Sequence, residues 1–79
     1  MNERKYRTKI NAPEIEGRIR HLYIFEEFDR LNAGEFIELS NDHDPKPLFH
    51  LFMVEREGIF TWEYLQEGPL LWQVAIGKK

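Results

Sequence analysis

Residues 41–47, Asn-Asp-His-Asp-Pro-Lys-Pro, form a sharp boundary between two apolar segments of this 79-residue chain. Aspartate is among the best N-cap residues of helices, because its side chain accepts a bond from a free backbone N–H. Proline is favoured at the first helical position, where its missing N–H would have had no partner. These rules predict a strand that ends before Asn41 and a helix that begins at Pro45, with Asp44 as its N-cap.

The first part of the chain predicts one strand and one helix. Residues Tyr6–Ile10 alternate in polarity, which indicates a half-buried strand near a sheet edge with Tyr6 and Ile10 on the same side. Residues Ile19–Leu31 carry apolar side chains at helical spacing. We expect Gly34 to end this helix, because glycine readily adopts the left-handed conformation of a C-cap.

The later segments follow the same logic and end in a hairpin. Residues Glu35–Ser40 have apolar side chains on both faces, which favours a central strand. The remaining expected elements are a helix at Pro45–Glu57 closed by Gly58, a strand at Ile59–Leu65, a turn at Gln66–Pro69 and a strand at Leu70–Ile76.

The order β-α-β-α-β-β predicts an α+β fold, a two-layer α/β sandwich with a four-stranded mixed sheet and two helices on one face. The first β-α-β unit is expected to be parallel and right-handed, as such crossovers nearly always are. We expect a single domain over residues 1–79, with frayed ends at residues 1–4 and 77–79.

Composition narrows the possible functions. Hydrophobic residues make up 42% of the chain, which suits a folded domain, and the absence of cysteine excludes disulfides, thiolate metal sites and thiol nucleophiles. The net charge of −3 argues against a general nucleic-acid binder, which needs a basic face. No signal peptide and no apolar run long enough to cross a bilayer is present. We therefore expect a cytoplasmic protein with neither nucleic acid nor membrane as partner.

The polar residues around the two helix starts predict a site. If the first two strands are parallel, both helices begin at the same end of the sheet, where open α/β sheets tend to bind ligands. The predicted ligand-binding residues are His21, Asp42, His43, Asp44 and Lys46. Carboxylates and imidazoles are also metal ligands, so a divalent metal ion is a candidate cofactor, with His21, Asp42 and His43 as its candidate ligands.

Less specific interpretations compete with this site. His21 lies on the apolar face of its helix, where it would either bond a backbone carbonyl at the edge of the core or line the mouth of a pocket. The stretch Asn41–Pro47 could serve only as a helix start. His50 is about two turns from His43, roughly 10 Å along a helix, so these two residues are not expected to share a metal ion.

The second helix is apolar almost all round. One face must pack on the core, and the other would leave Phe49 and Met53 exposed as an interface for a partner or for a second copy in a homodimer. Crowding in a small core is the alternative explanation.

Several segments between Ile19 and Ile76 resemble a known family. They are Phe28-Asp29-x-Leu31, Gly34-Glu35, Asn41-Asp42-His43-Asp44-Pro45-x-Pro47-Leu48, Trp62-Glu63-Tyr64 and Glu67-Gly68-Pro69. They are similar to a prokaryotic family of small domains of unknown function that looks related to the TusA/SirA sulfur-carrier fold. The resemblance implies the same two-layer architecture.

The resemblance does not extend to sulfur chemistry. TusA-type carriers have a Cys-Pro-x-Pro motif after the first strand, whereas this chain reads Ala12-Pro13-Glu14-Ile15 there. Persulfide transfer therefore cannot be carried over. The resemblance implies hemerythrin-like or other redox proteins as partners and a metal- or redox-linked accessory role.

Three functions remain as expectations. The first is a non-enzymatic binding module that holds a metal ion or small ligand, or docks on a partner, at the predicted site. The second is a small enzyme in which His43 acts as a general base beside Asp42. The third is a purely structural interaction domain. Nucleophilic catalysis lacks support, because the hydroxyl residues Ser40, Thr8 and Thr61 fall in predicted strands.

Overall fold

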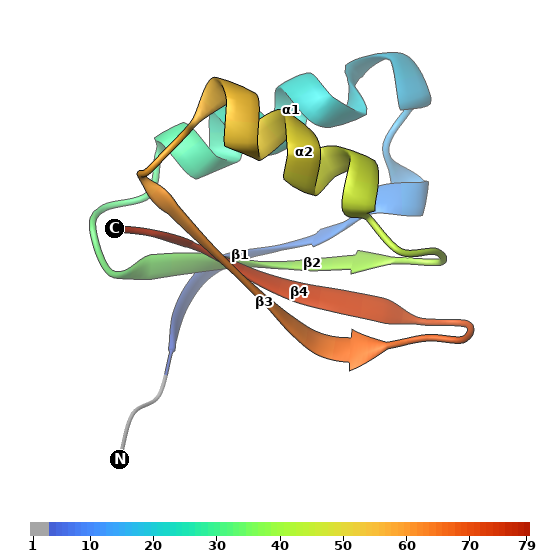
Figure 1. Cartoon of the computed structure of the whole chain (residues 1–79). Helices are drawn as coiled ribbons and strands as arrows, with labels where there is room; N and C mark the ends of the chain where they lie inside the picture. Colours follow the sequence, from blue (N-terminus) through green and yellow to red (C-terminus); the bar gives the residue numbers. More distant parts are fainter. Residues whose placement is uncertain (1–3) are drawn as a thin grey trace.

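Within residues 4–79, the part of the chain that the computed structural model describes, a mixed sheet carries two α-helices on one face (Figure 1). The elements are β1 (Lys5–Asn11), the short 3-10 helix η1 (Ala12–Glu14), α1 (Gly17–Asp29), β2 (Glu35–Asn41), α2 (Lys46–Glu55), β3 (Phe60–Glu67) and β4 (Trp72–Lys78). The predicted α+β sandwich and its order of elements are confirmed. No helix in this range is long and apolar enough to cross a membrane.

The strands lie in the order β1-β2-β4-β3. β1 and β2 are parallel, and β4 is antiparallel to both of its neighbours. The predictions of an edge position for the first strand and a central position for the second are therefore confirmed. Because β1 and β2 are parallel, α1 and α2 both begin beyond the C-terminal ends of these strands and run in the same direction (Figure 1).

The core lies between the helices and the sheet. Phe52 of α2 is fully buried and packs on two phenylalanines of α1, with ring centroids 4.5 Å from Phe25 and 5.2 Å from Phe28. The sheet contributes buried aliphatic side chains, namely Ile10, Ile37, Leu39, Val74 and Ile76. This packing fixes the separation of the two helices.

The end of α1 differs from the prediction. The helix begins at Gly17, ends at Asp29 and has Arg30 as its C-cap. Gly34 has φ 88°, but it lies in the turn before β2, where its N–H donates to the carbonyl of Lys78 at 2.8 Å. The Lys78 ammonium donates to the carbonyls of Asp29 and Leu31, both at 3.0 Å. A side chain from β4 thus serves carbonyls for which the sequence had suggested a glycine cap.

The prediction that Asp44 caps α2 is wrong. The N-cap is Pro45, which makes no side-chain cap bond, and the helix begins at Lys46. Asp44 instead accepts a hydrogen bond from the Tyr64 hydroxyl at 2.6 Å. A bond to β3 has replaced the local one, and nothing in the residues near Asp44 announces it. The helix also ends at Glu55, two residues earlier than predicted.

A register shift in β1 separates residues that were expected to share a face. Tyr6 pairs with Phe36 and Ile10 pairs with Leu39, with an irregularity between Tyr6 and Thr8. Phe36 and Leu39 are three residues apart on β2, so they point to opposite faces. Tyr6 therefore packs on Phe36, with ring centroids 6.0 Å apart, while Ile10 is buried in the core.

The chain ends also differ from expectation. Gly77 and Lys78 belong to β4, and the Lys79 N–H donates to the Ile59 carbonyl at 3.0 Å, so residues 77–79 are not a frayed end. Arg4 forms an ion pair with Glu63 of β3. The predicted fraying of residues 1–3 lies outside the described residues. At the other hairpin strand, β4 begins at Trp72 rather than at the predicted Leu70.

Candidate binding pocket at the helix starts

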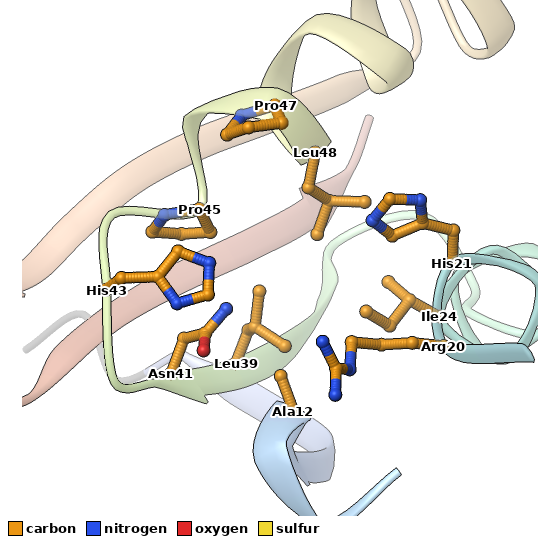
Figure 2. Close-up of a pocket in the computed structure, with 10 residues that line it drawn as sticks. All are labelled: Ala12, Arg20, His21, Ile24, Leu39, Asn41, His43, Pro45, Pro47 and Leu48. Carbon is orange, nitrogen blue, oxygen red and sulfur yellow. The ribbon is translucent and has the colours of Figure 1, made fainter. Parts of the chain in front are cut away.

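A small pocket lies beyond the C-terminal ends of β1 and β2, where α1 and α2 begin. Its volume is about 50 Å³. The ten residues that line it are Ala12, Arg20, His21, Ile24, Leu39, Asn41, His43, Pro45, Pro47 and Leu48 (Figure 2). Parallel pairing explains how they meet. β1 leads into Ala12, β2 ends at Asn41, and each strand is followed by one of the two helices.

Two of the predicted site residues, His21 and His43, line this pocket together. His43 comes from the loop after β2, and His21 comes from the first half of α1. Figure 2 shows the two imidazole rings on opposite walls, with His21 beside Leu48 and His43 beside Pro45. His21 thus lies at a pocket mouth, as one of its two predicted interpretations required.

His43 is paired with its neighbour Asp42. Its Nδ1 lies 2.7 Å from Asp42 Oδ1, and both side chains are about two-thirds exposed, at 64% and 69%. Since an ionised carboxylate only accepts, Nδ1 is the donor. This hydrogen bond is the main reason why the pKa of Asp42 lies below its ordinary value. Asp42 orients the ring but does not itself line the pocket.

Arg20 is a pocket residue that was not among the predicted site residues. Its Nη2 donates to the carbonyl oxygen of Ile15 at 3.0 Å, which holds the guanidinium in place. Among residues 4–79, two buried side-chain nitrogens lack a hydrogen-bond partner, Arg20 Nε and Trp62 Nε1. The sequence did hold a signal, because Arg20 precedes the buried Ile24 by four residues and so shares its face of the helix.

Asn41 is the other polar residue that the sequence interpretation placed outside the site list. It ends β2 and is only 8% exposed. Its Oδ1 accepts a hydrogen bond from the Asp42 N–H at 2.8 Å, which fixes the orientation of the amide. Figure 2 shows the amide nitrogen turned toward the pocket.

The remaining predicted ligand-binding residues lie elsewhere. Asp44 is bonded to Tyr64, and the exposed Lys46 is not part of the pocket wall. Within residues 4–79, no three His, Cys, Asp or Glu side chains are grouped so that they could hold a metal ion. The three candidate ligands His21, Asp42 and His43 therefore do not form such a group.

The predicted interface residues differ from each other. Phe49 is half-buried and packs on Trp62, with ring centroids 5.3 Å apart, so the expectation that it is exposed is wrong. Phe49 faces β3, where its ring packs on Phe60 and Trp62. Met53 is exposed at 49%, next to Val54 at 76%.

The ionisable side chains that line the pocket are all basic. Its lining contains one arginine and two histidines but no carboxylate, although the whole chain has a net charge of −3. The arginine is permanently charged, and imidazoles acquire a charge at mildly acidic pH. The pocket is thus suited to negatively charged or hydrogen-bond-accepting groups.

A family model described as "Uncharacterized conserved protein (DUF2249)" matches residues 9–78. The chain belongs to this family. No curated protein and no solved structure matches the chain. The range matched to DUF2249 contains every residue that lines the pocket, so the pocket is built entirely from the family's portion of the chain.

Proposed function

We propose that the protein is a non-enzymatic cytoplasmic binding module that holds a small ligand in the pocket between the starts of α1 and α2. The observation that carries this proposal is the convergence of Arg20, His21 and His43, from two separate elements, on one cavity. Residues that support only a helix start have no reason to converge in this way. The purely structural role is therefore the less favoured alternative.

The size of the pocket limits the ligand. Sites for drug-sized molecules have volumes of roughly 300–1,000 Å³, whereas this pocket measures about 50 Å³. On the same measure, a cavity that holds one water molecule needs about 10–15 Å³. The pocket thus suits a ligand of a few non-hydrogen atoms, or a terminal group of that size.

Binding can be tested by NMR with a panel of small anionic, cationic and neutral compounds. We expect at least one compound to shift the resonances of His21, His43 and Asn41 together. His50 is an internal control, because it is exposed on α2 and does not line the pocket. The proposal would be contradicted if the compounds shifted only His50. It would also be contradicted if no compound shifted the pocket residues.

A second candidate function is proton transfer by His43. Its bond to Asp42 leaves Nε2 as the basic nitrogen of the neutral ring, which is the arrangement of a general base held by a carboxylate. A substrate screen would test this function. Turnover must be lost in His43→Ala and retained in His50→Ala, and equal activity in both variants would exclude the role.

We also propose that this prokaryotic family is related to the TusA/SirA-like sulfur carriers and shares their fold. The order of elements and the placement of both helices on one face support the relationship. At the position that the resemblance assigns to the carriers' cysteine stands Ala12, which is buried in the pocket wall. A crystal structure with a different strand order would contradict the relationship.

Protein docking is proposed as the context in which the module acts. The resemblance implies hemerythrin-like or other redox proteins, and the exposed Met53 and Val54 support a surface that faces a protein. A homodimer is the alternative use of the same surface. Sedimentation of the chain alone and with a candidate partner would separate these cases, and a monomer in both would remove docking.

A further inference from the structure

We infer that the ligand of this pocket is a free, small oxoanion, bound by N–H groups of Arg20, His43 and Asn41 with His21 on the wall opposite His43. This inference rests on the proposed function, because it requires that the pocket bind a ligand. It adds the chemical class of that ligand and the donors that select it.

The first step concerns the side chain of Arg20, which is partly buried at the pocket. Nε is buried without a partner among the described residues, and Nη2 is held by the carbonyl of Ile15. A buried donor that remains unsatisfied carries a desolvation penalty. No carboxylate lines the pocket, and the charge of Arg20 is only the last of the causes that lower the pKa of the exposed Asp42 outside it. An anion in the pocket would place a negative charge beside the guanidinium.

The second step is the direction of the His43 donor. Because Nδ1 is bound to Asp42, the protonated ring can direct only its Nε2–H to a ligand. Figure 2 shows the ring on the pocket wall. Asp42 lies outside the lining and is exposed, so it orients the ring without facing the ligand.

The third step concerns the amide of Asn41. Its oxygen is already used by the Asp42 N–H, which leaves the amide nitrogen as the group turned to the pocket. Together with Arg20 on the α1 side and His43 on the opposite wall, it gives N–H donors from the floor and both sides of the cavity (Figure 2). Several convergent N–H donors match the oxygens of a carboxylate, nitrate or phosphate, which only accept when ionised.

The backbone at the start of α2 adds little to this anion site. Helix N-termini usually offer free N–H groups to anions. Here Pro45 and Pro47 have no N–H, and the N–H groups of Leu48 and Phe49 both donate to the carbonyl of Pro45. Selectivity must therefore come from the side chains, which makes the inference testable by substitution.

A free ion is the ligand that the pocket can hold whole. About 50 Å³ accommodates formate, nitrate or phosphate, whereas the organic part of a larger molecule would have to remain outside the pocket. A cation is disfavoured by the permanent charge of Arg20. A neutral amide of similar size would fit the space but would leave that charge without a counterion.

The test is an NMR and calorimetric titration of the full chain with sodium formate, nitrate and phosphate at constant ionic strength. Acetamide is the neutral compound of similar size, and a phosphomonoester represents the same chemistry on a larger molecule. We expect at least one free oxoanion to shift His21, His43 and Asn41 together. Arg20→Gln should weaken its affinity by about tenfold or more, the effect of losing one charge-assisted hydrogen bond.

Arg18→Gln is the matched control. Arg18 lies on the same helix, is exposed and pairs with Glu16 rather than lining the pocket. The Arg18→Gln variant removes the same net charge as Arg20→Gln. Because Arg18 does not line the pocket, we expect the oxoanion affinity of this variant to equal that of the unmodified chain. If Arg20→Gln does not fold, Arg20→Lys replaces it, because lysine keeps the charge but lacks the planar guanidinium donors, and we expect the oxoanion affinity to fall in this variant as well.

Three results would overturn the inference. They are an equal loss of affinity in Arg18→Gln, tighter binding of acetamide than of any oxoanion, and binding of the phosphomonoester without binding of free oxoanions. In the second and third cases the pocket still binds a ligand, so the proposed function stands and only the ligand class fails. If no compound of any charge shifts the pocket residues, both fail.

Discussion

The hydroxyl of Tyr64 donates a 2.6 Å hydrogen bond to Oδ1 of Asp44, and this bond ties the outer strand β3 to the loop that carries His43. Burial raises the pKa of Tyr64, and the bond to the carboxylate raises it further. The phenol therefore stays protonated and remains a donor at neutral pH. The loop that forms this pocket wall is therefore held by a side chain of β3, the outer strand farthest from β1.

This bond predicts strong coupling between the two residues. Tyr64→Phe removes the donor and should lower the free energy of unfolding by about 1–2 kcal/mol, as expected for a hydrogen bond to a charged acceptor. Asp44→Ala should cost a similar amount, and the double variant should cost little more than Asp44→Ala alone. Urea denaturation of the four proteins measures the coupling. Additive losses would restore Asp44 to a role independent of Tyr64, such as a helix cap.

Gly77 predicts a steric requirement on the face of the sheet away from the helices. A Cβ at this position would lie 2.4 Å from Cε2 of Phe36 and 2.5 Å from Oγ1 of Thr61. Gly77→Ala should therefore destabilise the fold by about 1–3 kcal/mol, the usual range for overpacking. Thermal denaturation measures this loss.

Two further variants make the Gly77 prediction specific. Gly17→Ala should cause no loss, because a Cβ at Gly17 would meet nothing within 4 Å and the residue starts α1. Gly77→Ala should cost less in a Phe36→Ala background than in the unmodified chain, because Phe36→Ala removes the nearest obstructing atom. A Gly77→Ala protein as stable as the unmodified chain would show that the ring moves freely.

Glu35 predicts a dependence of stability on pH. Its side chain is buried, and the Asn32 N–H donates to its Oε1 at 2.7 Å. This bond, followed by the charges of Arg7 and Lys5, holds the pKa of Glu35 below its ordinary value. A carboxyl with a lowered folded-state pKa adds stability above its unfolded pKa of about 4.3, and this contribution is lost as pH falls through the folded-state value.

The measurement compares the unmodified chain with Glu35→Gln by urea denaturation from pH 7 downward. The variant should unfold at lower urea at pH 7, and the two midpoints should approach each other as pH falls below the unfolded-state pKa of about 4.3 toward the lower folded-state pKa. Lys5 and Arg7 are the basic side chains in its ion pairs, and both remain charged throughout this range. A constant gap at all pH values would assign the loss to side-chain packing.

Phe49 and Met53 are predicted to behave oppositely, although both lie on α2. Phe49→Ala should lower the free energy of unfolding by about 2 kcal/mol, less than a fully buried phenylalanine, because Phe49 packs on Phe60 and Trp62 but keeps some exposure. Met53→Ala should change it by less than about 0.5 kcal/mol, as surface substitutions do. Equal losses would mean that Met53 is covered in solution.

The fold was predictable because the patterns that set it are local. Alternation marked the strands, helical spacing marked α1, and the proline-rich stretch at residues 45–47 marked the start of α2 to within one residue. The errors arose where a distant partner replaced a local one. Lys78 serves the carbonyls of Asp29 and Leu31 from 49 and 47 residues away, and Tyr64 takes Asp44 from the cap position at a separation of 20 residues.

The pocket was predictable only in part. His21 and His43 follow from parallel strands and helix faces, which residue order alone can indicate. Residue order also places Arg20 near this end of the sheet, but its bond to the carbonyl of Ile15 depends on how the chain turns between β1 and α1. Asn41 looks like a strand end, although it is only 8% exposed and lines the pocket.

The position of β4 in the sheet has a consequence for how the chain acquires its structure during synthesis. β4 is the last strand in sequence, yet it lies between β2 and β3 and pairs with both. Until β4 emerges from the ribosome, β3 has no strand partner within this domain, and the edge of β2 that pairs with β4 remains open. Because an unpaired edge can recruit other chains, translation speed and chaperone access near the end of this segment should affect its yield more than the sequence of β1 does.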